Sequence, residues 1–149
     1  MQAGRFDIAE APGHLIRRAH QISVATFAEE TAPFDVTPVQ FAILNTLKGE
    51  QGVDQVTLAG RVAFDAATIG SVIARLERKG WLRREAAGAD RRRKLLWLTP
   101  SGQQAAVGME ANVARVQERI LEPLSEAEQQ QFMALLAKLI TKRGQTPRP

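Results

Sequence analysis

The chain has 149 residues, of which 44% are hydrophobic and 24% are charged, with a formal net charge of +4 and no cysteine. These proportions fit a globular protein of about one domain and exclude a wholly disordered or fibrous chain, and the lack of cysteine excludes disulfides, thiolate metal sites and cysteine nucleophiles. The longest apolar run, Phe132 to Ala137, is far shorter than the roughly 18 residues of a membrane helix, and the N-terminus has no signal-peptide pattern, so we predict a cytoplasmic protein with no membrane segment.

Hydrophobic periodicity predicts four helices in the first half of the chain. The second begins at Pro38, because Thr37 and Gln40 form a capping-box pattern and proline suits a first helical position. Asp65 is the predicted N-cap of the fourth helix, and Gly80 ends it. The predicted ranges are 14–30, 38–49, 55–62 and 66–79.

The second half is predicted to hold a β-hairpin followed by two long helices. Two short strands, over residues 81–84 and 94–98, flank a loop over residues 85–93 that contains Gly88. Thr99 and Pro100 repeat the pattern of an N-cap followed by a first-position proline. The two predicted helices run from Pro100 to about Leu121 and from the Ser125–Glu128 capping box to about Lys142.

Helix, turn, helix and then a basic hairpin is the order of a winged helix-turn-helix, which is mainly α with a small β-hairpin wing. The N-terminal end of the 66–79 helix suits the major groove, because its small residues permit close approach and its hydroxyls can reach base edges. The candidate DNA-binding residues on it are Ala66, Ala67, Thr68, Ser71 and Arg75. The alternative is an ordinary amphipathic core helix.

The charge is concentrated in one segment. Residues 61–94 hold ten basic and four acidic residues, a net charge of +6, which leaves −2 for the rest of the chain. Arg91, Arg92 and Arg93 in the predicted hairpin loop suit phosphates or a minor groove. A basic face that is merely solvated remains the alternative, but the arginine triplet on a hairpin favours double-stranded DNA as the partner.

The stretch from Val56 to Gly102 resembles the MarR family of bacterial transcription regulators. The residues that carry the resemblance are Asp90-x-Arg92 followed by Leu98-Thr99-x-x-Gly102, and Leu76-Glu77-x-Lys79-Gly80-Trp81-Leu82. The resemblance implies that the 66–79 helix is the recognition helix. It also implies that Asp90 braces the wing and that Arg92 contacts DNA.

The terminal helices carry apolar stripes that predict a homodimer. One stripe repeats at intervals of 3 and 4 residues, which favours a helix–helix interface, and burial inside one chain is its alternative. A dimer on DNA predicts a palindromic operator, and MarR-like proteins dimerise through these helices. The stripes are Ala106, Met109, Val113, Val116 and Ile120, and Phe132, Leu135, Leu136, Leu139 and Ile140.

The sequence therefore predicts four parts along the chain. They are an N-terminal arm and first helix (1–33), a winged DNA-binding core (34–99), dimerisation helices (100–143) and a flexible tail (144–149).

The first helix suggests an effector pocket. A helical projection places His20 inside its apolar arc and Arg17 at the edge, and a cation beside apolar walls suits an aromatic carboxylate. We predict that Arg17, His20 and His14 bind such a ligand and that Phe41 forms a wall. The alternatives are a solvated Arg17, a hydrogen-bonded core His20 and a plain core Phe41. MarR-like regulators commonly bind phenolic or aromatic acids, and the PGHLIRRAHQ stretch is similar to members that control aromatic-acid catabolism.

These observations together predict a dimeric, sequence-specific transcriptional regulator, a repressor released by a small aromatic acid or its thioester. A ligand-independent architectural winged-helix protein is the alternative. We expect no enzyme, because His20 and Arg17 lack acid partners and no catalytic motif is present. We expect no cofactor and no metal, since His14 and His20 lie about 240° apart around a helix and cannot chelate one ion.

Overall fold

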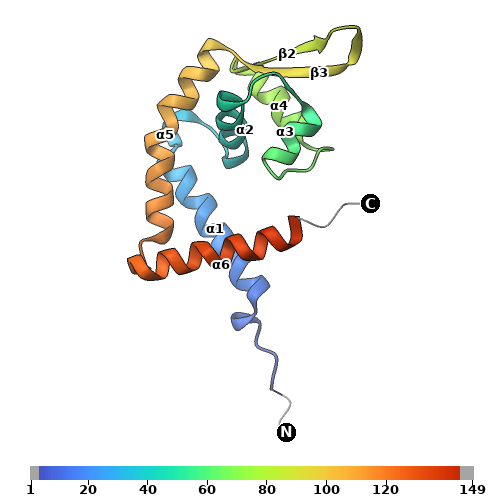
Figure 1. The fold of residues 1–149 in the computed structure, drawn as a ribbon. Coiled ribbons are helices and arrows are strands. Elements are labelled where there is room, and N and C mark those ends of the chain that lie inside the picture. Colours follow the sequence, from blue (N-terminus) through green and yellow to red (C-terminus); the bar gives the residue numbers. More distant parts are fainter. Residues whose placement is uncertain (1–3, 145–149) are drawn as a thin grey trace.

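The computed structural model describes residues 4–144 and is mainly helical, with one small sheet (Figure 1). The predicted fold class, mainly α with a hairpin wing, is confirmed. The helices are the 3-10 helices η1 (Ile8–Glu10) and η2 (Ala32–Phe34) and the α-helices α1 (Pro12–Glu30), α2 (Pro38–Gly49), α3 (Gln55–Arg61), α4 (Ile69–Arg78), α5 (Pro100–Leu121) and α6 (Glu126–Gly144). The strands are β1 (Val53–Asp54), β2 (Leu82–Ala87) and β3 (Asp90–Leu98). Residues 145–149 of the predicted tail lie outside the described residues.

The sheet is antiparallel in the order β1-β3-β2, and its hairpin is longer than predicted. Pairing continues from Leu82 opposite Leu98 to Ala87 opposite Asp90. Gly88, with φ +54°, makes the left-handed bend of a short turn. The arginine triplet therefore lies within β3, and its prediction as loop was wrong. Residues 91–93 have no assigned partner on β2, because the register shifts between the Ala86–Lys94 and Ala87–Asp90 pairs; a bulge of this kind adds residues to a strand without ending it. Strand β1 was missed, because two residues carry no periodic pattern.

Helix α4, the predicted recognition helix, starts later than predicted. Asp65 does not cap α4 with its side chain: its Oδ1 accepts the Ala67 N–H at 3.0 Å, and its carbonyl oxygen accepts the Ile69 N–H at 2.9 Å. Asp65 thus caps a separate turn over residues 66–68, and α4 begins at Ile69. The preceding helix, α3, ends at Arg61, one residue before the predicted Val62.

The junction between the wing and α5 explains why Thr99 and Gly102 occur in the motif Leu98-Thr99-x-x-Gly102. The Thr99 hydroxyl donates to the Gly80 carbonyl at 2.5 Å and accepts the Gly102 N–H at 3.0 Å, so it caps α5 and ties it to the end of α4. A Cβ on Gly102 would lie 1.9 Å from the carbonyl oxygen of Trp81. Only glycine allows the first turn of α5 to pack this closely against the backbone before β2.

One hydrophobic core joins α2, α3, α4, the sheet and the first half of α5. Its fully buried members come from every one of these elements, so the buried side of α4 packs against the whole winged unit. They are Ile43, Leu44, Leu47, Leu58, Ile69, Ile73, Leu76, Leu96 and Met109.

The predicted interface stripe on α5 is mostly buried within the chain itself. Ala106, Met109 and Val116 are 1% exposed or less, and Val113 packs partly buried against the core. The prediction that this stripe requires a partner was wrong, because α1 and α2 already cover it. A heptad-like spacing reports a helix–helix contact without saying whether the second helix belongs to the same chain.

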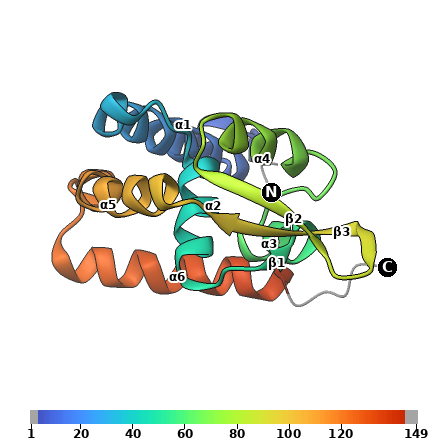
Figure 2. The same cartoon turned by 90° about the horizontal axis from the view of Figure 1, so that it is seen from above.

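Most of the exposed large apolar residues lie instead on α6 and α1. Leu135, Leu139 and Ile140 are 56–67% exposed, and Ile16 and Ile22 are more than half exposed. Helix α6 packs extensively on no other described element. Figure 1 draws α6 across α1, but Figure 2 shows them on opposite sides of α5. Each of these two helices therefore keeps an apolar face that the described chain does not cover.

Candidate DNA-binding surface and effector hollow

The turn before α4 and the first turn of α4 present small and hydroxyl side chains to solvent. Ala66, Ala67, Thr68 and Ser71 are all exposed. The Ser71 hydroxyl donates to the Thr68 carbonyl at 2.9 Å, which leaves its oxygen free to accept. Arg75 follows one turn later and is also exposed. The structure thus brings together all five residues predicted for this helix, four of them at or before its first turn.

The wing is braced at its tip and at its base. Asp90 Oδ1 accepts the Arg92 N–H at 3.0 Å and holds the start of β3, while the Arg92 side chain is exposed. Arg93 Nε lies 3.2 Å from Asp54 Oδ2. Arg93 therefore supports the base of the wing as well as contributing charge. Arg91 lies in β3, and its side chain is outside what the structure describes.

Asp54 connects the wing to the helix-turn-helix. Its Oδ1 accepts the Thr57 N–H at 2.8 Å as the N-cap of α3. The hydrogen bonds from Thr57, followed by the charge of Arg93, hold the pKa of Asp54 below its ordinary value. One ionised carboxylate thus fixes both the start of α3 and the direction of β3.

Part of the positive charge is neutralised within the chain. Arg83 pairs with Glu85, and Arg84 Nε lies 3.4 Å from Glu77 Oε1. Among the described side chains of the basic segment, five cations take part in no ion pair. They are Arg75, Arg78, Arg92 and Lys94, together with Lys79, whose ammonium group bonds a backbone carbonyl.

A hollow of about 440 Å³, here called the central hollow, lies between α1, α2, α3 and α5. Phe41 lines it, and its ring centroid is 6.5 Å from that of Phe27. Asn45 also lines it, opposite α5. The remaining lining residues are Ser23, Pro38, Ala42, Thr46, Arg61, Val62, Ala63, Val113, Val116 and Gln117.

The predicted ligand residues of α1 do not line the central hollow of the single chain. His20 is exposed and so is not a hydrogen-bonded core histidine; it lies on the same side of α1 as Ser23, one turn closer to the N-terminus. Arg17 is exposed, and its Nη2 lies 3.5 Å from His14 Nδ1. The structure therefore brings together Phe41 and the hollow, while His14, Arg17 and His20 form a separate group on α1.

Sequence reasoning missed the floor of the central hollow. Arg61, Val62 and Ala63 line it, and they form the end of α3 and the start of the turn to α4. Arg61 is held by Glu50, with Arg61 Nε 3.1 Å from Glu50 Oε2. Ala63 has φ +52°, an uncommon backbone conformation for a residue with a Cβ. The Glu50–Arg61 ion pair joins residues on either side of β1 in the chain, and its spacing of 11 residues matches no periodic pattern in the sequence.

The described residues were also compared with the requirements of a metal site and of a membrane-spanning helix. Within residues 4–144, no three His, Asp or Glu side chains gather where they could hold a metal ion. None of the helices in this range has the length and apolar character needed to cross a membrane.

The fold and this surface define a winged helix-turn-helix protein. Residues 34–93 match the MarR family. The transcriptional regulator HosA of Escherichia coli is 32% identical over 127 residues, which span 85% of this chain and 93% of HosA. The chain belongs to the MarR family and is a transcriptional regulator, so the resemblance carried by its wing residues is confirmed.

Solved structures agree over almost the whole chain. The PcaV transcriptional regulator of Streptomyces coelicolor, in complex with its natural ligand, is similar with a TM-score of 0.84 at 35% identity, covering 93% of this chain and 97% of PcaV. BpsR of Bordetella bronchiseptica, whose DNA binding is regulated by 6-hydroxynicotinic acid, has a TM-score of 0.86 at 32% identity, covering 91% of this chain and 97% of BpsR.

Proposed function

We propose that this regulator is a homodimeric repressor that binds a palindromic operator and is released by a small aromatic acid or its thioester. The observation that carries the proposal is the position of the central hollow. It lies directly behind the turn that leads into the recognition helix, with Val62 and Ala63 in its wall. A ligand in the hollow would therefore contact the segment that positions α4.

For DNA, we propose that the N-terminal part of α4 reads bases and that the wing contacts the backbone. Thr68 and Ser71 supply exposed hydroxyls at the end of the helix that enters the major groove in this fold. Arg92 supplies an exposed guanidinium on the wing, outside any ion pair of the described side chains. Hydroxyls near base edges suit specificity, and a wing cation suits affinity.

For the dimer, we propose that α6 and the N-terminal half of α1 meet a second copy of the chain. Large apolar side chains on both are more than half exposed, and uncovered apolar faces of this kind mark interfaces. A two-fold axis between two such copies would set two recognition helices on half-sites about one helical turn of DNA apart. The operator is therefore expected to be palindromic.

For the effector, we propose an aromatic ring in the central hollow, against Phe27 and Phe41. The hollow is large enough for a ring with a carboxylate, because drug-sized sites begin at about 300 Å³. Burial of the α1 face in a dimer would bring Arg17 and His20, with His14 beside Arg17, out of water to pair the carboxylate. PcaV is similar in its complex with a natural ligand, and 6-hydroxynicotinic acid regulates the DNA binding of BpsR, which supports regulation by a small molecule here.

Release would be a shift between two dimer states. The bound ligand favours a state in which the two α4 helices no longer match the half-site spacing, so the affinity for DNA falls. The rival, an enzyme with a site at Arg17 and His20, would need an acid partner, and no ion pair among the described side chains includes either residue. A ligand-independent architectural protein would bind DNA equally with and without small acids.

The experiment is operator selection from random duplexes, repeated with benzoates, hydroxybenzoates, hydroxynicotinates, cinnamates and their thioesters. We expect a palindromic consensus whose affinity falls when one of these compounds is added. A consensus that no compound affects would support the architectural alternative. Failure to enrich any sequence would refute the sequence-specific regulator itself.

A further inference from the structure

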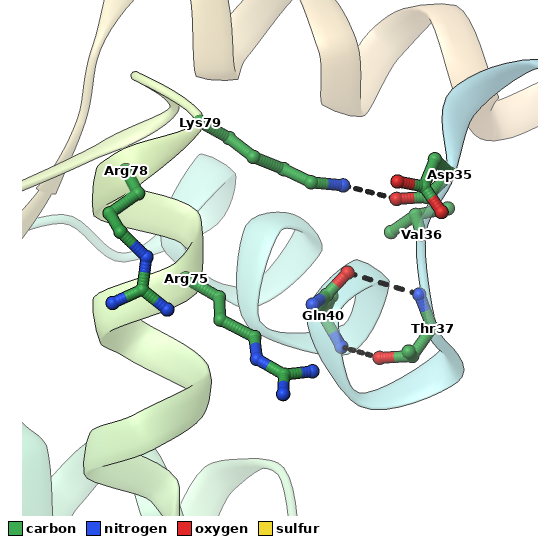
Figure 3. Close-up of a pocket in the computed structure, with 7 residues that line it drawn as sticks. All are labelled: Asp35, Val36, Thr37, Gln40, Arg75, Arg78 and Lys79. Atoms are coloured by element: carbon green, nitrogen blue, oxygen red, sulfur yellow. Dashed lines mark hydrogen bonds between the residues drawn. The ribbon is translucent and has the colours of Figure 1, made fainter.

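A second hollow, of about 390 Å³, lies between the C-terminal half of α4 and the first turn of α2; we call it the α2–α4 hollow (Figure 3). It is separate from the central hollow and shares none of its lining residues. Its wall is predominantly cationic and hydrogen-bonding. The lining residues are Asp35, Val36, Thr37, Gln40, Arg75, Arg78 and Lys79.

Two of the three cations in this wall are available to a ligand. Lys79 is already engaged, because its Nζ donates to the Asp35 carbonyl and lies 4.6 Å over the Trp81 ring. Arg75 and Arg78 are exposed, lie three residues apart on one helix, and take part in no ion pair among the described side chains. The Asp35 carboxylate is the single acid of the wall, which leaves a net charge of +2.

The opposite wall offers a fixed neutral donor. Gln40 is only 6% exposed, and its Oε1 accepts the Thr37 N–H at 3.1 Å. Because the amide oxygen is committed to Thr37, the Nε2 group points away from Thr37, and Figure 3 shows it on the side toward Arg75. No hydrogen-bond acceptor within the described residues engages this Nε2. A buried amide donor thus faces two guanidinium groups across the hollow.

We propose that the α2–α4 hollow binds a phosphoryl group, namely one backbone phosphate of the operator in each half-site. Guanidinium groups match phosphate oxygens with two donors each. The Gln40 amide and the positive end of α2 add donors and partial charge on the other side. The inference rests on the proposed DNA-binding function, because the hollow opens along the same helix that carries Ser71.

The position of the hollow selects a backbone phosphate over a base. A recognition helix in the major groove is flanked by the sugar–phosphate backbones, and the element packed beside it meets one of them. Here that element is the first turn of α2, which bears Thr37 and Gln40. A contact to one phosphate from both α2 and α4 would fix how deeply α4 enters the groove, without reading sequence.

The test uses Arg78→Ala and Gln40→Glu in the full chain. Glutamate at this position keeps the capping box, since it still accepts the Thr37 N–H, but it replaces the amide donor with an oxygen that repels phosphate. We expect each variant to bind the selected operator about tenfold more weakly. The loss should be equal on unrelated duplexes, and Arg78→Ala should lower the salt slope by about one. Arg18→Ala, which removes an exposed cation of α1, is the control and should leave DNA affinity unchanged.

A set of operators with single methylphosphonate substitutions locates the phosphate. Wild type should lose affinity at one position in each half-site, and at that position alone the two variants should lose nothing further. Variants that lose affinity equally at every position would overturn the proposal, as would variants that bind like wild type. Unchanged melting temperature and dimer mass for Gln40→Glu establish that its effect is not unfolding.

A final arm separates a DNA phosphate from a free one. Inorganic phosphate, compared with chloride at equal ionic strength, should compete only weakly with operator. If inorganic phosphate binds wild type but not Gln40→Glu, and the methylphosphonate pattern is flat, the hollow is a site for a free anion and the proposed DNA contact is wrong. If wild type selects no operator at all, the proposed function fails before this inference is reached.

Discussion

The winged core and the terminal helices differ in how completely one chain can cover them. In the core, Ile43, Leu44 and Leu47 on α2 are fully buried. On α6, Leu139 and Ile140 are 56% and 67% exposed, although their residue types are just as apolar. The comparison shows that the winged core is packed within one chain, whereas α6 keeps an apolar face that this chain does not cover and that the proposed dimer would bury.

The two regions should therefore fail in different ways. Loss of a core side chain leaves a cavity and lowers the free energy of unfolding. Loss of the α6 face should separate two folded protomers and remove the coupling between half-sites. Substitutions matched for size or charge can separate these outcomes.

The largest expected effect is that of Leu135→Glu combined with Leu139→Glu on α6. Charges on this face should yield monomers, and operator affinity should fall by about 100- to 10,000-fold because avidity is lost. Analytical ultracentrifugation and anisotropy measure the two quantities. Gln130→Glu, an exposed polar site on the same helix, is the control. A double variant that stays dimeric at micromolar concentration would contradict the assignment of the interface.

Met109→Ala tests the hydrophobic core that is packed within one chain. Met109 is fully buried on α5, so truncation should lower the free energy of unfolding by about 2–5 kcal/mol while the protein remains a dimer. Urea denaturation at fixed protomer concentration measures this. Val107→Ala, at a residue that is 53% exposed, should change stability little. Dissociation of Met109→Ala without loss of stability would show that α5 faces a partner after all.

Arg17→Ala tests whether the terminal helices, here α1, also take part in effector binding. Operator affinity should stay near that of wild type, while the concentration of aromatic acid needed for release should rise about tenfold, since a buried carboxylate would lose its cation. His20→Ala should do less, because a neutral imidazole has one donor. Calorimetry supplies the ligand affinities, with Arg18→Ala as control. If the ligand affinity is unchanged in Arg17→Ala, the effector site in the hollow is retained as a hypothesis, but Arg17 is not one of its ligand-binding residues.

Arg92→Ala tests the contribution of the wing, in the winged core, to DNA affinity. Affinity should fall about threefold to tenfold on all duplexes, and the salt slope should fall by about one, because a phosphate or minor-groove contact is lost. Thr68→Ala and Ser71→Ala should instead change which bases are preferred in a selection experiment. Equal effects of all three variants on unrelated sequences would contradict this division of roles.

The smallest expected effect is a pH dependence at the contact between the terminal helices α1 and α5. Hydrogen bonds and charge from Arg115, then Arg119, hold the pKa of Glu30 below its ordinary value of 4.5. Its contribution to stability is thus present above pH 4.5 and is lost as the pH falls through the lower, folded-state pKa. Urea denaturation between pH 3 and 6 should show a shallower decline for Glu30→Gln than for wild type. Parallel curves would exclude a role for this carboxylate.

Capping patterns were predictable because their chemistry lies within four residues. Thr37 and Gln40 form the predicted capping box, and Thr99 caps α5 as its spacing indicated. Asp65 shows the limit of such patterns. It makes the hydrogen bond expected of a cap, but to a turn, because a local motif does not say whether a helix follows at once.

The candidate DNA-binding residues could also be named from the sequence, since they follow one another along one helix and one strand. The lining of the central hollow could not be. Phe41 and Arg61 come from helices that meet only when the core forms, and the Glu50–Arg61 pair has no spacing that marks it. The α2–α4 hollow was likewise invisible, because Gln40 and Arg78 lie on two separate helices.

The sequence by itself thus determined the fold class, the family and most helix boundaries, because caps, glycines and periodicity act over one or two turns. Only the tertiary structure decided that the stripe through Met109 and Val116 faces its own chain, while Leu139 on α6 remains uncovered. The physical reason is that periodicity states which side of a helix avoids water. Which surface covers that side depends on how the whole chain packs.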